Sequence, residues 1–392
     1  MSIRNIALFI FAALMLTVCI AASGCGSGQE QPAEQVISWS SVPEEYWGMF
    51  SGGSFDEDDV WFTDDGQYAD MLKELKAYCK ENYPGTIVLA TDERMLFAGG
   101  WNGQDTDGGT VDPFTVYEAG SYTKQITAAA VLQLVEQGRL SLDDTLDKFF
   151  PQCPNIADAT VGNLMDMNAG IPEFLDTMKF FKGCSSETKE AFAGGTLPDE
   201  EVLAVLSKLH CNAPGLYYEY CNTNFWLLAL VIEQVTGQPY DEYITAQILE
   251  PCGMENTSSC AQGDVTIVPY QEDAAFWKYC RNMRGAGDIH TTACDILRWD
   301  REFFSGSVLS PEMMTYVTDR EGDYSCGWMK KNGGEVFTHS GVTDACSLQT
   351  TVYRLEGGNV YLIQLLTNPR KGPQLYEAKK IVEEFLQVEK WG

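Results

Sequence analysis

The chain has 392 residues, of which 45% are hydrophobic and 12% aromatic, so it carries enough apolar material for a large buried core. This composition excludes a mainly disordered chain, and 36 glycines and 13 cysteines are too dilute for a collagen-like or disulfide-scaffold protein. The 56 acidic residues outnumber the 26 basic ones, and the formal charge of −30 argues against nucleic-acid partners and against charge-driven binding to anionic lipid.

The first residues have the pattern of an export signal. Arg4 precedes Ile6–Ile20, an uncharged and mostly apolar run that is short for a membrane-spanning helix. The Ala-Ser-Gly-Cys sequence that ends at Cys25 resembles a bacterial lipobox, which implies cleavage before Cys25 and lipidation of its thiol. We therefore expect residues 1–24 to be a lipoprotein signal peptide. The mature protein would be anchored to the outer face of the cytoplasmic membrane; ordinary secretion and an uncleaved anchor are the alternatives.

Residues 25–68 are expected to link this anchor to a folded domain at 69–392. The segment from Gly26 to about Val42 is small, polar and proline-containing, which is typical of a tether. Phe55–Asp65 is acidic with embedded aromatic residues, and we interpret it as a solvated lead-in.

The cysteines and histidines predict neither a disulfide framework nor a metal site. When Cys19 and Cys25 are set aside, 11 of the 13 cysteines remain, so at least one is unpaired within the monomer. Their spacing is irregular and no Cys-x-x-Cys occurs, so we expect mainly buried thiols. The three histidines are far apart and lack metal-ligand spacing. No metal or other cofactor is expected.

The first predicted elements of the domain are a helix, a hairpin and a second helix. Apolar residues at helical spacing indicate a helix over Ala69–Asn82, and strand-like runs follow at Thr86–Ala90 and Arg94–Ala98. Gly99–Asp112 is rich in glycine and aspartate and is predicted to be a loop. Ser121–Gln137 has the apolar periodicity of a strong helix, which Gly138 would end.

The remainder divides into helical and strand-rich parts. Helices and loops are expected up to about Ser259, including a fully buried helix at Phe225–Val235. Three strands and a closing amphipathic helix follow, at Glu335–His339, Ser347–Arg354, Asn359–Leu366 and Gln374–Val388. A sheet built from both chain ends with a large helical insertion lobe is an α/β (α+β) fold, and a cleft between its lobes is a usual place for a ligand.

A serine and a lysine at the start of the second helix are the first candidates for chemistry. Ser121 and Lys124 lie one turn apart on one helix face, so the lysine could accept the serine proton if desolvation lowers its pKa. The spacing alone is weak, because Ser186 and Lys189 repeat it. That second copy lies in a polar stretch without a following apolar helix, so we interpret it as solvated surface.

The stretch Tyr117–Asp144 resembles the active-site region of serine β-lactamase-related proteins, which include class C β-lactamases, penicillin-binding DD-peptidases and related esterases. Two further motifs occur in the family's order: Tyr220-Cys221-Asn222 is similar to its Tyr-x-Asn element, and His339-Ser340-Gly341 is similar to its Lys-Thr-Gly or His-Ser/Thr-Gly element. The resemblance covers roughly Thr86–Asn368 and implies a β-lactamase/DD-peptidase-like fold with an antiparallel sheet and the active site in the cleft between lobes.

The resemblance also implies a role for each of these residues. Ser121 would be the nucleophile, and Lys124 with Tyr220 would handle protons, the lysine cation making the phenol a better base. Asn222 would bind the substrate amide and Lys124. The cleft edge would be formed by His339, Ser340 and Gly341, and the backbone amides of Ser121 and Val342 would hold the oxyanion. We expect His339 to be neutral or cationic near pH 6 to 7 and to bind a carboxylate more weakly than lysine would.

Two departures from the family pattern concern the surroundings of this site. Met167-Asn168-Ala169-Gly170 stands where many relatives carry His-Thr-Ser-Gly, and we expect that segment to support the site without supplying the nucleophile. Cys221 replaces the common serine between Tyr220 and Asn222.

These residues predict a cell-surface serine hydrolase that acts through a Ser121 acyl-enzyme. The expected substrates are D-alanyl peptides of the cell wall or β-lactams. The alternatives are an esterase or amidase on the same fold, and a non-catalytic penicillin-binding-like sensor or binding protein that kept the cleft.

Overall fold

The structure is a computed structural model and describes residues 44–388 apart from 65, 260–266 and 268–281. The described residues all belong to one compact unit. The expected signal peptide, Cys25 and the tether from Gly26 to about Val42 lie outside the described residues. Among the helices that the structure does describe, none is both long and apolar enough to cross a membrane.

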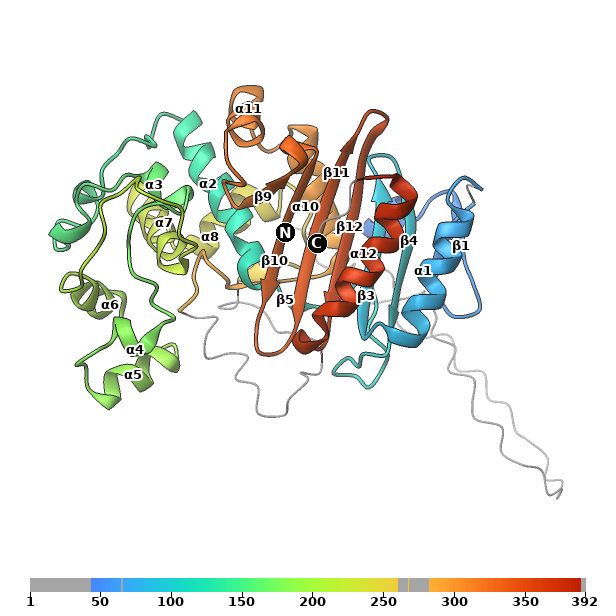
Figure 1. Cartoon of the computed structure of the whole chain (residues 1–392), viewed down its shortest axis with the longest axis horizontal. Helices are drawn as coiled ribbons and strands as arrows, with labels where there is room; N and C mark the ends of the chain where they lie inside the picture. Colours follow the sequence, from blue (N-terminus) through green and yellow to red (C-terminus); the bar gives the residue numbers. More distant parts are fainter. Residues whose placement is uncertain (1–43, 65, 260–266, 268–281, 389–392) are drawn as a thin grey trace, which may run out of the picture. The chain divides into compact units, whose positions relative to one another are not determined.

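A nine-stranded antiparallel sheet with the order β1-β2-β4-β3-β12-β11-β10-β9-β8 organises this unit (Figure 1). Its centre is the pairing of β3 with β12, where Gly85 lies opposite Leu366, so the two ends of the folded chain meet in one sheet. The predicted α/β class with a sheet built from both chain ends is therefore confirmed. The strands are β1 (Gly53–Phe55), β2 (Trp61–Thr63), β3 (Gly85–Thr91), β4 (Met95–Trp101), β8 (Tyr324–Ser325), β9 (Trp328–Lys331), β10 (Val336–Val342), β11 (Ser347–Leu355) and β12 (Gly358–Leu366).

Both faces of the central strands are buried. Ile87 and Leu89 of β3 belong to a core shared with α1 and α12, whereas Val88 and Ala90 face the larger core that contains α2, α7 and α10. Figure 1 shows α1 and α12 next to each other over one side of the sheet. Burial on both faces explains why these strands have continuous apolar sequences.

The helical insertion lies between β5 and β7, which pair in a small second sheet of the order β5-β7-β6. Its central helix α7 is buried along most of its length and contacts α2, α3 and α8. The small-sheet strands are β5 (Tyr117–Glu118), β6 (Ser258–Ser259) and β7 (Ile289–Thr291). The helices are α1 (Ala69–Asn82), α2 (Thr123–Glu136), α3 (Val161–Met165), α4 (Thr177–Phe180), α5 (Ser186–Ala193), α6 (Asp199–Leu206), α7 (Asn222–Thr236), α8 (Tyr240–Ile244), α10 (Ala293–Ser305), α11 (Pro311–Asp319) and α12 (Gly372–Leu386).

The acidic lead-in differs from its prediction. The 3-10 helix η2 (Glu44–Met49) and strands β1 and β2 are part of the folded unit, and the Tyr46 and Trp61 side chains are buried. The acidic residues remain at the surface, where Asp58 accepts ion pairs from Lys76 at 2.6 Å and Lys80 at 2.9 Å. The aromatic residues of this stretch therefore extend the sheet, while its carboxylates pair with α1.

Candidate active site

Ser121 lies where a short 3-10 turn, η3 (Gly120–Tyr122), runs into α2. Gly120 has a φ of +51°, a left-handed conformation that favours glycine. Lys124 follows one turn later, and its Nζ donates a hydrogen bond to Ser121 Oγ over 3.0 Å. Ser121 is partly exposed and Lys124 is fully buried, so the hydroxyl can be reached from solvent while the amine is shielded.

Three acceptors surround Lys124 Nζ. Besides Ser121, Asn222 Oδ1 accepts a hydrogen bond over 2.8 Å and the Ala286 carbonyl oxygen accepts one over 2.6 Å. These contacts use all three donors of an ammonium group. Burial lowers the pKa of Lys124 to about 7, although the Glu173 carboxylate opposes that shift. A large fraction of Lys124 is therefore neutral near pH 7 and able to accept a proton.

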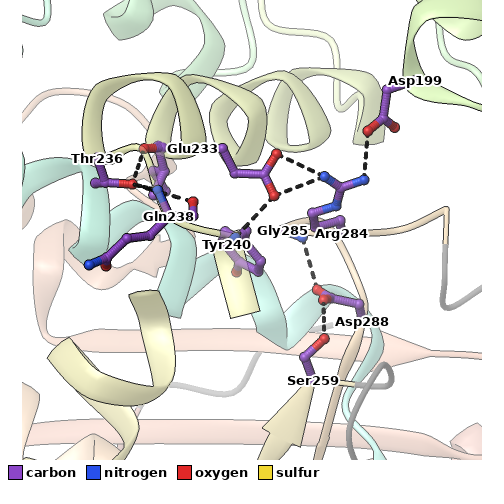
Figure 2. Close-up of polar contacts among 10 residues, drawn as sticks. Asp199, Glu233, Thr236, Gln238, Tyr240, Ser259, Arg284, Gly285 and Asp288 are labelled. Carbon is purple, nitrogen blue, oxygen red and sulfur yellow. Dashed lines mark hydrogen bonds and ion pairs between the residues drawn. The ribbon is translucent and has the colours of Figure 1, made fainter. Parts of the chain in front are cut away.

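A tight turn before β7 places the Ala286 carbonyl on Lys124. Asp288 is fully buried and accepts hydrogen bonds from the Gly285 amide at 2.9 Å and from Ser259 Oγ at 3.0 Å (Figure 2). Thr127 of α2 donates to the Gly285 carbonyl at 2.6 Å. Side chains of α2 thus bind two successive carbonyls of the turn, which fixes its position against the helix.

Arg284 ties the start of this turn to the helical insertion. Its guanidinium donates to both Glu233 oxygens in α7 at 2.9 Å and to Asp199 in α6 at 2.8 Å, as Figure 2 shows. Both carboxylates are partly exposed, so these ion pairs matter chiefly for geometry. The location of the Lys124 acceptor therefore depends on the packing of α6 and α7.

Tyr220 lies directly before α7, with its ring centroid 5.0 Å from Lys124 Nζ. Burial raises the pKa of Tyr220 above its usual 10, and a hydrogen bond with Ser121 opposes this only in part. The expectation that Lys124 makes Tyr220 a better base is therefore wrong, because desolvation of the phenol dominates its pKa. Tyr220 is a neutral phenol that can donate a proton.

His339 lies on β10, opposite Tyr220, with 6.4 Å between the ring centroids. Its Nδ1 donates to the Ser340 carbonyl over 2.8 Å. Burial and the nearby Lys124 charge lower the pKa of His339 to about 3, so the expectation that it titrates between pH 6 and 7 is wrong. A neutral His339 brings no positive charge to this wall of the site.

The end of β10 packs directly against the turn that carries Ser121. A Cβ at Gly341 would lie 1.8 Å from the Ala119 carbonyl oxygen, and one at Gly120 would lie 3.1 Å from the Val342 nitrogen. Glycine at both positions therefore permits this close approach. It brings the Val342 backbone next to Ser121, as a shared oxyanion site requires. Ser340, two residues before Val342 in β10, is partly exposed.

The Met167–Gly170 segment packs against the loop that precedes α7. Three backbone hydrogen bonds join it to residues 212–219. Met167 is fully buried with a φ of +56°, and its Sδ accepts a hydrogen bond from the Cys221 amide at 3.3 Å. These contacts support the loop that carries Tyr220, in the manner expected of a segment that holds the site without supplying its nucleophile.

Two partners of Lys124 were missed by sequence reasoning. The Ala286 carbonyl belongs to the backbone and has no side-chain signature. Glu173 follows Ile171-Pro172, and its Oε2 accepts hydrogen bonds from the Asn222 backbone amide at 2.6 Å and from Asn222 Nδ2 at 3.1 Å. The one feature of the sequence that could have indicated Glu173 is that it is an acidic residue close to the altered 167–170 segment.

The other predicted features lie apart from Ser121. Ser186 and Lys189 are exposed on α5, as expected of the second Ser-x-x-Lys copy. Within the described residues, no group of three or more His, Cys, Asp or Glu side chains could hold a metal ion. The nine described cysteines are free thiols, and seven are buried, in agreement with the expectation of buried thiols.

Comparison with known proteins identifies the family of this chain. The beta-lactamase family model matches residues 69–378, which include every residue of the site described above. The chain belongs to the beta-lactamase family. Family membership supports serine hydrolase activity.

Individual relatives agree with this membership. The protein named penicillin-binding protein PbpX of Bacillus subtilis (strain 168) is 24% identical to this beta-lactamase-family protein over 320 residues, which is 77% of this chain and 75% of PbpX. The crystal structure of D-amino acid amidase from Ochrobactrum anthropi SV3 superposes with a TM-score of 0.66 at 19% identity, covering 81% of this chain and 98% of the amidase. FmtA from Staphylococcus aureus gives a TM-score of 0.64 at 18% identity, covering 83% of this chain and 90% of FmtA. These two structures show the shared fold.

Proposed function

We propose that this beta-lactamase-family protein is a serine hydrolase that forms a covalent acyl intermediate on Ser121. The observation that carries the proposal is the contact between Ser121 Oγ and Lys124 Nζ, 3.0 Å apart. Lys124 is fully buried and has a pKa of about 7, so near neutral pH it can take a proton from a serine hydroxyl that is itself accessible.

The reaction would run in two halves. In the first, Ser121 Oγ attacks the substrate carbonyl carbon while Lys124 takes the hydroxyl proton. The carbonyl oxygen becomes an oxyanion held by the backbone amides of Ser121 and Val342. The bond to the leaving group then breaks as Tyr220 donates its phenol proton to that group, and the proton that Lys124 took from Ser121 replaces it on Tyr220. In the second half, water attacks the acyl carbon while Lys124 accepts the water proton. Lys124 then gives this proton to Ser121 Oγ, which leaves as a hydroxyl.

D-alanyl peptides of the cell wall and β-lactams are the proposed substrates. Similarity to proteins named as a penicillin-binding protein and as a D-amino acid amidase supports acyl transfer at an amide bond. The proposed anchoring through Cys25, on the outer face of the cytoplasmic membrane, would hold the enzyme near the wall by a short tether. A non-catalytic sensor is the class-level alternative.

A second candidate is hydrolysis of small esters or amides that lack a carboxylate next to the scissile bond. The observation that favours it is the neutral His339, whose pKa burial lowers to about 3. A substrate carboxylate would meet no cation at this position of β10, whereas an uncharged group would lose little on entering.

Intact-mass spectrometry with a fluorophosphonate probe and with penicillin tests the proposal. Ser121 Oγ would form a bond to phosphorus as fluoride leaves, or would open the β-lactam ring, and peptide mapping would locate the adduct. We expect labelling that is lost in Ser121→Ala and Lys124→Ala and kept in Ser186→Ala, the control in the exposed Ser-x-x-Lys copy. Penicillin labelling favours the cell-wall substrates, and fluorophosphonate labelling alone favours the ester or amide substrates. A folded protein that reacts with neither probe would support the sensor.

A further inference from the structure

Glu173 is a carboxylate beside the proposed catalytic residues, and the reaction steps above do not use it. It is half-buried in the segment that precedes α4. The residues on either side of it are held by one threonine of α7: Thr223 Oγ1 donates to the Pro172 carbonyl at 2.8 Å and accepts from the Phe174 amide at 2.9 Å. The backbone on both sides therefore fixes where the Glu173 side chain begins.

Three N–H groups converge on the two oxygens of this carboxylate. Oε2 accepts from the backbone amide and from the Nδ2 of Asn222, at 2.6 and 3.1 Å, and Oε1 accepts from the Leu175 amide at 2.9 Å. An ionised carboxylate can accept at both oxygens. A glutamine in the same place would turn an NH2 group toward at least one of these N–H groups, so its shape would fit but its hydrogen bonds would not.

The carboxylate also decides which way the Asn222 amide is turned. With Nδ2 directed at Glu173, Oδ1 is directed at Lys124 and accepts the 2.8 Å hydrogen bond from Nζ. If the amide were turned over, its NH2 group would meet the donors of Lys124 and the hydrogen bond would be lost.

We propose that Glu173 is a positioning residue that fixes the orientation of the Asn222 amide and thereby the hydrogen bond that holds Lys124 against Ser121. The inference rests on the proposed function, in which Lys124 takes the proton of Ser121. Glu173 acts through Asn222 and through its charge.

The charge of Glu173 gives this role a signature of its own. Among the described residues, the groups that face Lys124 are Glu173, Cys221, Tyr220 and His339. Burial raises the pKa of the Cys221 thiol to about 12 and that of Tyr220 above 10, and His339 is neutral, so Glu173 supplies the negative charge in this set. That charge favours the protonated form of Lys124, and its removal lowers the pKa of Lys124.

The test compares the rate of Ser121 labelling by a fluorophosphonate in the full-length protein and in Glu173→Gln, measured by intact mass from pH 5 to 9. We expect the plateau rate of the variant to fall by about 10- to 100-fold, because Lys124 is no longer held in place. We also expect the midpoint of the labelling curve, the pH at which the rate reaches half of its plateau, to move to lower pH. Asp144→Asn is the matched control, because Asp144 also accepts from a backbone amide and pairs with a lysine, but it is partly exposed and its partners are Ser141 and Lys148.

The outcomes separate this inference from the proposed function. A wild type that is not labelled refutes the proposed function. If the wild type is labelled but the pH midpoint of labelling is the same in Glu173→Gln, the role of Glu173 is overturned, whether or not the plateau rate falls. A purely structural defect would lower the plateau rate alone.

Glu173→Asp is the variant to use if Glu173→Gln does not fold. It keeps the carboxylate charge, but its shorter side chain moves the carboxylate away from Asn222. For this variant, a lowered plateau with the wild-type midpoint supports the inference, and an unchanged plateau overturns it.

Discussion

Replacement of Lys124 by methionine should change how the stability of the protein depends on pH. The fold lowers the pKa of Lys124 from 10.5 to about 7. At about 1.4 kcal/mol per pKa unit, this shift corresponds to roughly 5 kcal/mol by which the folded state disfavours the protonated amine. Between pH 7 and 10.5 the unfolded chain binds this proton and the folded protein does not, so the free energy of unfolding rises with pH through that window.

Methionine keeps the apolar stem and removes the titration. We therefore expect the stability of the wild type relative to Lys124→Met to increase by about 3 kcal/mol between pH 7 and 9.5, and to be constant below about pH 6. Urea unfolding followed by the fluorescence of the nine tryptophans would measure it at each pH, and other titrating groups cancel in the difference. A difference that stays flat from pH 7 to 9.5 would refute the argument, since Lys124 would then be protonated throughout and unable to act as the base.

Three further substitutions test other parts of the site. Gly341→Ala should destabilise the protein by about 1–3 kcal/mol and abolish Ser121 labelling, because its Cβ would lie 1.8 Å from a carbonyl oxygen; Gly357→Ala, with no atom within 4 Å, should do neither. Burial raises the pKa of Asp288 from 3.8 to about 6, so the free energy of unfolding of the wild type should fall by about 2 kcal/mol relative to Asp288→Asn as pH rises from 4 to 6. A difference in unfolding free energy that stays constant over this range would contradict the prediction. His339→Gln should change the labelling rate by a constant factor from pH 5 to 8, and a ratio that changes near pH 6.5 would mean that His339 titrates.

Local patterns predicted several helices and strands of the fold. The helix expected at Ala69–Asn82 has those bounds in the structure, because its apolar residues repeat at helical spacing and Pro84 follows its end. The three strands near the end of the chain are β10, β11 and β12, each within a few residues of the predicted bounds. The contact between Ser121 and Lys124 is likewise local, since it depends on one turn of helix.

The features that sequence reasoning missed depend on tertiary packing. Burial sets the pKa of His339, and neither its neighbours in the sequence nor its motif reveals that depth. The Ala286 carbonyl reaches Lys124 because Asp288 closes a turn far along the chain. The stretch around Trp61 was expected to be solvated because its charge is conspicuous, yet its aromatic side chains decide where it packs.

The acceptors of Lys124 also explain why the altered 167–170 segment is compatible with an intact site. Nζ is held by groups at 121, 222 and 286, and none of them lies in that segment, which instead supports the neighbouring loop through Met167. Loss of any one acceptor would leave a buried donor unsatisfied and would favour the neutral amine further. The same contacts therefore position Lys124 and tune its pKa, so a change that removes one of these acceptors should also lower the pH at which Ser121 reacts.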